Sequence, residues 1–191
     1  MLQAMFDPAI VDEPSRLRRL SRKEYDRMVE LGMFENEKVE LLHGLVVTMS
    51  PQGWAHMTAV AWFTQELVLQ LNRTYQVRPQ GPFAADDWSE PEPDIAVAKF
   101  DPTVREHPSE LLLLIEVAAS SLRFDRGVKR KLYAQIGIPE YWIVDVETMT
   151  VTVHTQPSAA GYARVDVLRD GDVLHPTLLP AVAIAIADIP R

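Results

Sequence analysis

The chain has 191 residues, a formal net charge of −8 and a hydrophobic share of 47%, which fits one soluble domain with a sizeable core. No apolar stretch reaches the ~18 residues of a membrane span, and the prolines and acids between Pro8 and Pro14 interrupt any signal-peptide segment. The chain contains no cysteine, which excludes disulfides, thiolate metal sites and cysteine nucleophiles and favours a cytoplasmic location.

The first elements predicted along the chain are a flexible arm, a helix and a hairpin. We expect residues 1–15 to form the arm and residues 16–191 to form a single domain. The pattern Ser21 to Glu24 has the form of a capping box, which predicts a helix to about Leu31. The stretch KVELLHGLVVTMS then predicts two short strands around a turn at His43-Gly44.

The middle of the chain alternates between helical and extended patterns. A long amphipathic helix is predicted over residues 56–75, where apolar residues recur at helical spacing without Gly or Pro. Strands follow at about 76–79, 94–98 and 111–118. A second helix is predicted over 126–136 and ends before Gly137 and Pro139.

The C-terminal part is predicted to be mostly extended. EYWIVDVE and MTVTVHTQ predict one hairpin, with Trp142 buried beside the central strand and Ile143 and Val144 on its two faces. GYARVDVLRDGDVLH predicts another, turning at Asp170-Gly171. The apolar tail AVAIAIADI is expected at the edge of the sheet. The fold class is therefore α/β, or α+β in stricter terms, with a mixed central sheet flanked by two main helices.

Two acids stand at the ends of predicted strands. Asp94 opens DIAVA, and Glu116 ends the aliphatic run in ELLLLIEVA and alternates with Ile115 and Val117. A lone ionised carboxylate in a covered strand is costly, so something must compensate it. A divalent cation shared by Asp94 and Glu116 would do so. The alternatives are a solvated strand end and pairing with Arg. Glu90 and Glu92 are expected to be solvated residues on the approach to the site; the alternative is that one of them contacts a second ion.

The helix at 126–136 carries a candidate lysine. Asp125, Lys129 and Tyr133 lie at i, i+4 and i+8, in one row at the boundary between core and solvent. From that row Lys129 could lean toward Glu116. Metal-bound carboxylates with one lysine can hydrolyse a phosphodiester, because the metal polarises the phosphoryl oxygen and the lysine stabilises charge. The alternative is an ordinary ion pair between Asp125 and Lys129.

Two clusters of basic residues are compatible with nucleic acid as a partner. Residues 16–27 hold six basic residues and residues 123–131 hold five, despite the acidic balance of the chain. Such runs can contact phosphates. Considered alone, the two runs are better explained as solvated helix faces.

These residues resemble a known superfamily. Asp94, Glu116 and a nearby lysine resemble the PD-(D/E)XK nucleases, with Pro93-Asp94 as the literal PD. A closer resemblance is to the Uma-two-type family of restriction-endonuclease-like proteins. The stretches that carry it are VELLHGLVVTMSP, PEPDIAV, LLLLIEVAASS, DRGVKRKLYAQIGIPEYWIVD and HPTLLP. The similarity runs from about Ser21 to the C-terminus.

The resemblance implies roles for individual residues. Asp94, Glu116 and the main-chain carbonyl of Val117 would bind Mg²⁺ or Mn²⁺, and Lys129 would be the catalytic lysine. Glu40 matches the upstream acid of the family and His56 a histidine near the site; a helix cap or a core-edge residue is the alternative for His56. Ala118 stands where the superfamily motif has lysine, so the lysine must come from the helix.

The expected function is a Mg²⁺-dependent DNA endonuclease, and the expected assembly is a homodimer, so that two sites can cut two strands. One alternative is a nuclease-fold module with little or no activity that binds DNA or protein. Another is a metal-dependent hydrolase with a different substrate.

Overall fold

A computed structural model describes residues 17–118 and 121–190 of the chain, so the arm predicted at 1–15 lies outside the described residues. The centre is a six-stranded sheet in the order β3-β4-β5-β6-β7-β8. Its strands are β3 (Tyr75–Pro79), β4 (Ile95–Lys99), β5 (Leu113–Ala118), β6 (Glu140–Asp145), β7 (Thr150–Ser158) and β8 (Gly161–Leu168). β5 and β6 run parallel and the other neighbours antiparallel, which confirms the predicted mixed sheet.

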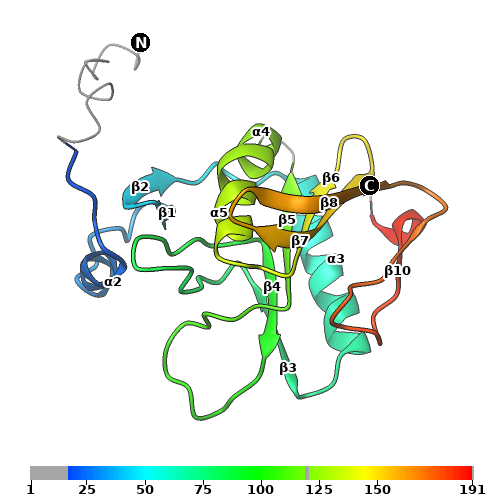
Figure 1. The fold of residues 1–191 in the computed structure, drawn as a ribbon, viewed down its shortest axis with the longest axis horizontal. Helices are drawn as coiled ribbons and strands as arrows, with labels where there is room; N and C mark the ends of the chain where they lie inside the picture. Colours follow the sequence, from blue (N-terminus) through cyan, green and yellow to red (C-terminus); the bar gives the residue numbers. More distant parts are fainter. Residues whose placement is uncertain (1–16, 119–120, 191) are drawn as a thin grey trace.

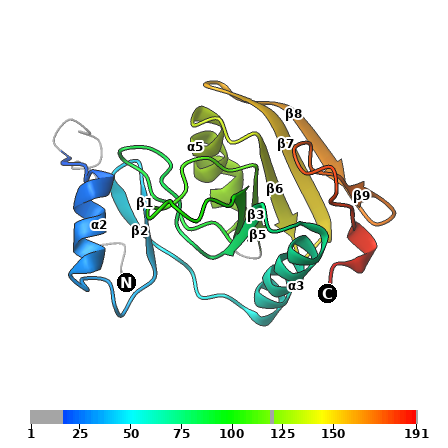
Figure 2. The same ribbon diagram turned by 90° about the horizontal axis from the view of Figure 1, so that it is seen from below.

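Helices cover both faces of this sheet (Figures 1 and 2). α3 (Trp54–Gln70) lies on one face, and the other carries α4 (Leu122–Phe124), the π-turn η2 (Asp125–Lys129) and α5 (Arg130–Gln135). Strand residues alternate between the two resulting apolar clusters: Ile115 and Val117 pack with α3, whereas Leu114 and Ala118 pack with α5. Glu116 therefore points toward the helices that carry Lys129.

The central strand β6 confirms its prediction. Trp142 is fully buried, and it shares the α3 side of the sheet with Val144. Ile143 packs on the α5 side. Both faces of β6 are covered, as a strand next to a parallel neighbour requires.

The N-terminal part forms a small unit beside the main sheet. α2 (Arg22–Glu30) begins with the predicted capping box, in which Ser21 and Glu24 satisfy each other's main-chain N–H groups. β1 (Val39–Leu42) and β2 (Leu45–Thr48) form the predicted hairpin. The turn needs positive φ at both His43 (51°) and Gly44 (81°), which a His-Gly pair can adopt.

Both main helices differ from the predicted ranges. α3 begins at Trp54 and ends at Gln70, because the chain turns extended at Leu71 and enters β3 at Tyr75. The second helical region begins at Leu122 and contains a π-turn, so the sequence at 122–125 is also helical. None of the described helices has the length and apolar character needed to cross a bilayer.

The predicted hairpin at 161–175 is wrong in its pairing. The 169–172 turn is present, but β8 pairs with β7, and β9 (Val173–Leu174) pairs with β10 (Ile184–Ala185) instead. The tail, which continues through the 3₁₀ turn η3 (Ile186–Asp188), packs on the face of the sheet that carries α3 and not on an edge. Its buried aliphatic residues are the reason: Val182, Ile184, Ile186 and Ile189 all join that core.

Candidate functional site

Asp94 and Glu116 meet at adjoining strand ends. Asp94 immediately precedes β4, and its Oδ2 accepts a hydrogen bond of 2.8 Å from the main-chain N–H of Val117 on β5. In return, Glu116 Oε2 lies 3.4 Å from the main-chain N of Asp94. Both side chains are buried. Antiparallel pairing of β4 with β5 therefore brings together two acids that lie 22 residues apart.

The helical region on the α5 side supplies the partners of Glu116. Lys129 Nζ donates to Glu116 Oε1 at 3.0 Å, and the Tyr133 hydroxyl donates to the same oxygen at 2.9 Å. Asp125, Lys129 and Tyr133 form the predicted row, but the row is buried and does not border solvent. In contrast, the neighbouring apolar residue Val128 is 37% exposed.

A π-turn shapes this row. The main-chain N–H of Arg130 reaches back to the carbonyl of Asp125, one residue further than in an α-helix. Such turns insert one extra residue into a helix and recur at functional sites. Here the wider turn holds Asp125 and Lys129 with both side chains buried and Val128 turned outward.

Glu40 reaches the site from the N-terminal hairpin. Its Oε2 lies 3.2 Å from Lys129 Nζ and accepts a hydrogen bond of 3.1 Å from the main-chain N–H of Glu92. A bridge between Leu41 and Glu90 fixes β1 against the segment that leads to Asp94. Lys129 therefore lies between two carboxylates from different parts of the chain, and no pair with Asp125 forms.

His56 lies in the first turn of α3 and contacts Asp94. Its Nε2 is 3.0 Å from Asp94 Oδ1. Its Nδ1 is buried and has no hydrogen-bond partner among the described residues. The five predicted side chains, from Glu40 to Lys129, thus come together in one place.

These side chains line a cavity of about 320 Å³. Its walls come from β1, β2 and the following loop, the start of α3, the residue before β4, β5 and the 121–129 region. The residues that line it are Glu40, Val47, Thr48, Met49, Ser50, Pro51, Gln52, Gly53, His56, Asp94, Glu116, Ser121, Phe124, Asp125 and Lys129.

The electrostatics of the cavity are unbalanced toward negative charge. Burial raises the pKa of Glu116 well above its usual value, and the carboxylates of Asp94, Asp125 and Glu40 add to this against the opposing effect of Lys129. Burial alone would lower the pKa of Lys129, but Glu116, Glu40 and Asp125 raise it above that of a free lysine. Lys129 therefore stays protonated, and four acidic side chains surround one ammonium group.

The oxygen donors fit a hard divalent cation. Asp94 and Glu116 supply carboxylates, and the excess negative charge would be offset by the ion. The carbonyl of a strand residue points to the same edge as its own N–H, so that of Val117 faces the Asp94 side. Among residues 17–118 and 121–190, no three His, Asp or Glu side chains are arranged to hold one ion, so the main-chain oxygen would be an essential part of the set.

Sequence reasoning missed the roles of two residues, Tyr133 and Asp125. Tyr133 was recognised only as part of a row, although it binds Glu116 directly. Asp125, which lines the cavity and accepts a hydrogen bond of 2.6 Å from the Ser121 hydroxyl, was assigned only to a helix ion pair. The four-residue spacing of Ser121, Asp125, Lys129 and Tyr133 was the available signal.

The expectation that Glu90 is solvated is wrong. It is 4% exposed, because it lies between α2 and β1. Burial, followed by a hydrogen bond with Asp26, raises its pKa to about 8, although Arg22 opposes the rise. Glu90 therefore belongs to the contact between the N-terminal unit and the rest of the protein.

Residues 22–187 match the family described as "Uma2: Putative restriction endonuclease". The chain belongs to this family. The match covers the site from Glu40 to Tyr133 and continues into η3. No curated protein gives a significant match.

The Uma2 fold also occurs in a solved structure. A crystal structure described as "a putative nuclease belonging to DUF820", from Anabaena variabilis, superposes with a TM-score of 0.65 at 17% sequence identity. The match covers 80% of this chain and 89% of that one, so the two proteins share their fold.

The Uma2 fold explains how the site accommodates Ala118. Ala118 lies two residues after Glu116 on the same face of β5 and packs beneath the α5 side. Lys129 lies in η2, which packs over this face of the sheet, and its ammonium group reaches Glu116 across Ala118 from that side. The ammonium group is thus placed beside the acids from a helix and not from the strand.

Proposed function

We propose that this protein is a metal-dependent DNA endonuclease that uses Mg²⁺ or Mn²⁺. The main support is the placement of Lys129 within 3.0 Å of Glu116, next to the linked acid Asp94. Membership in the Uma2 family supports the nuclease assignment. Asp94, Glu116 and the Val117 carbonyl would hold the ion, which would polarise a phosphoryl oxygen and lower the pKa of a bound water.

The remaining residues have distinct tasks in this proposal. Lys129 stays protonated, so it would stabilise negative charge on the phosphate and would not accept a proton. Glu40 and Tyr133 hold Lys129 and Glu116 in place, and His56 orients Asp94.

DNA as the substrate is supported by the basic residues beside the cavity. Arg123, Arg126 and Lys131 are exposed on the same helical region as Ser121 and Phe124, which line the cavity. Cations at this position would neutralise backbone phosphates. We further propose a homodimer, in which two cavities would act on two strands.

The test is incubation with supercoiled and single-stranded DNA in the presence of Mg²⁺ or Mn²⁺. The wild type should nick DNA, and chelation should stop it. Glu116→Gln keeps the side-chain shape and should lose activity by orders of magnitude. Glu110→Gln, at an exposed acid in the loop before β5, should retain it. Binding without metal-dependent nicking would contradict the enzyme and favour a binding module.

A further inference from the structure

β8 forms an open edge of the sheet. It spans eight residues without Pro or Lys, and no other described segment pairs with its outer side. Figure 2 shows it at the outer margin of the sheet. The opposite edge, β3, has five residues and ends at Pro79, which cannot donate a ladder hydrogen bond. Natural sheets protect long edges, because unpaired main-chain groups invite another strand.

The side chains of β8 alternate in character. Arg164 and Asp166 lie on one face of the strand, and Arg164 Nε donates to Asp166 Oδ2 at 2.6 Å. Both side chains are substantially exposed, at 64% and 43%. The other face carries Val165 and Val167, 50% and 53% exposed. An exposed row of apolar side chains on an open edge strand is unusual for a monomeric protein.

The sequence of β8 is complementary to itself in antiparallel register. If two copies pair with Val165 at the two-fold axis, Arg164 of each copy lies opposite Asp166 of the other. On the other face Val165 meets its own copy, and Ala163 lies opposite Val167. Opposite charges and apolar pairs both stabilise directly opposed positions in a sheet.

We propose that β8 is a dimerisation edge, at which two copies of this chain join their sheets in antiparallel register centred on Val165. The occupant is a second copy because the pattern pairs each charge of the strand with its opposite on an identical strand. This deepens the homodimer proposed above by naming its surface. It does not depend on nuclease activity.

The test reverses the charge at Arg164 or at Asp166 of β8, one position in each variant. Arg164→Glu and Asp166→Arg each place like charges opposite each other in the homodimer. Each variant should therefore be monomeric, or its dimer dissociation constant should be at least 10-fold higher than that of the wild type. Sedimentation equilibrium or light scattering over a concentration series measures this. The wild type should have twice the mass of one chain.

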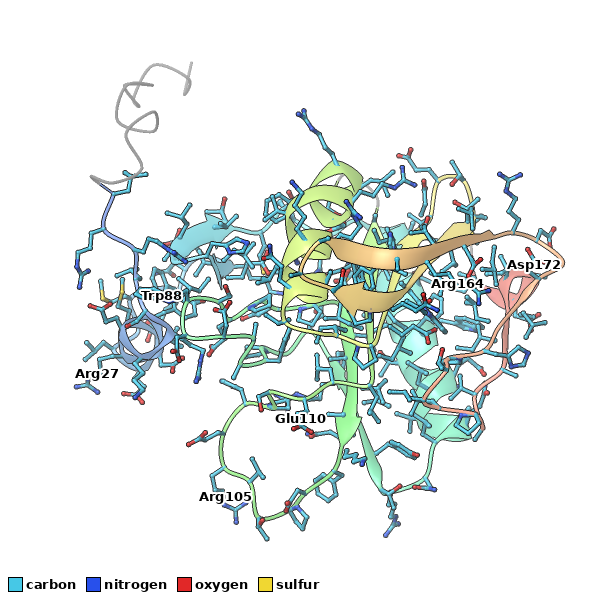
Figure 3. The ribbon with its side chains drawn as sticks, in the orientation of Figure 1. Arg27, Trp88, Arg105, Glu110, Arg164 and Asp172 are labelled. Carbon is cyan, nitrogen blue, oxygen red and sulfur yellow. The ribbon has the colours of Figure 1, made fainter. Side chains whose placement is uncertain are left out.

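Mixing the two variants separates contacts between chains from contacts within one chain. Each variant alone has lost its internal Arg164–Asp166 pair, but a heterodimer of the two restores opposite charges at both positions. Mixing should therefore restore the dimer mass. Arg105→Glu, on the loop between β4 and β5, lies apart from Arg164 in Figure 3 and should leave the wild-type mass unchanged.

A monomeric wild type, single variants that remain fully dimeric, or a mixture that stays monomeric would each overturn the proposal. Failure of DNA nicking would leave these masses unaffected. The two proposals therefore fail separately.

Discussion

Lys129 shows how burial changes the meaning of one residue. On an exposed helix its ion pair would contribute under ~1 kcal/mol. Here Lys129 is 4% exposed, and its ammonium group lies 3.2 Å from Glu40 and 3.0 Å from Glu116. Removing it leaves two buried carboxylates without a counter-charge, so its role in stability is inseparable from its place in the site.

We predict that Lys129→Met abolishes nicking and also destabilises the metal-free protein, by about 3–5 kcal/mol, the usual cost of breaking a buried ion pair. Urea unfolding at pH 7 measures this. The exposed neighbour variant Lys131→Met should change stability by less than ~0.5 kcal/mol. Adding Glu116→Gln to Lys129→Met should recover part of the loss. Unchanged stability in Lys129→Met would contradict the buried pair.

Glu90 makes stability depend on pH. Its pKa is raised from 4.5 to about 8 in the folded protein, so the folded state binds more protons than the unfolded state between these values. Its contribution to stability is fully present below about pH 4.5 and is lost as pH rises through about 8.

We therefore predict that Glu90→Gln flattens the pH dependence of unfolding. The free energy of unfolding of this variant, relative to wild type, should increase from pH 5 to pH 9, because the amide has no charge to bury. Urea denaturation at several pH values measures it. Glu110→Gln changes an exposed acid and should leave the profile as in wild type. A parallel profile for Glu90→Gln would show that Glu90 ionises normally.

At the scale of elements, one carboxylate anchors the C-terminal segment to the central strand. Glu140 opens β6 and is 2% exposed. Its Oε1 accepts from Trp142 Nε1 at 2.6 Å, and its Oε2 accepts from the main-chain N–H of Thr177 at 2.8 Å. This link helps to hold the chain from β9 to η3 on the α3 face of the sheet.

We predict that Glu140→Ala destabilises the protein by about 1–3 kcal/mol, because it leaves buried donors unpaired. Hydrogen exchange should accelerate at Thr177 and in β9 and β10 more than in β4 and β5. Glu147→Ala removes an exposed acid just after β6 and serves as the control. Equal acceleration in every strand would show that the link is not local.

At the scale of the whole molecule, the site ties together the hairpin, α3, the sheet and the 121–135 helical region. Its carboxylates repel one another when no cation is bound. An ion that binds only the folded protein stabilises it by mass action, by about 2.7 kcal/mol at 100 times its dissociation constant.

We predict that millimolar Mg²⁺ or Mn²⁺ raises the melting temperature of the wild type. Asp94→Asn removes one charge from the cluster, so it should bind the ion more weakly without loss of metal-free stability. Calorimetric titration and thermal unfolding measure both effects. Asp101→Asn alters an exposed acid after β4 and should bind the ion like wild type. No detectable ion binding to the wild type would remove the proposed metal site.

Local patterns were sufficient for much of the fold. Ser21 and Glu24 specify the start of a helix, and His43-Gly44 specifies a turn. The alternation around Glu116 and Trp142 specifies two strands that are covered on both faces. Each of these features depends on neighbours within a few residues. The resemblance to the Uma-two-type family, which the family match confirms, rested on such motifs as well.

Contacts between distant segments decided the rest. The partner of β9 is β10 and not β8, the tail lies on a face and not an edge, and Glu90 is buried, because these outcomes depend on which apolar surfaces the assembled sheet leaves uncovered. The convergence of Glu40, Tyr133 and Lys129 on Glu116 also required the tertiary structure. Their spacing in the sequence indicates faces of single elements, whereas the distances between those faces are set by packing.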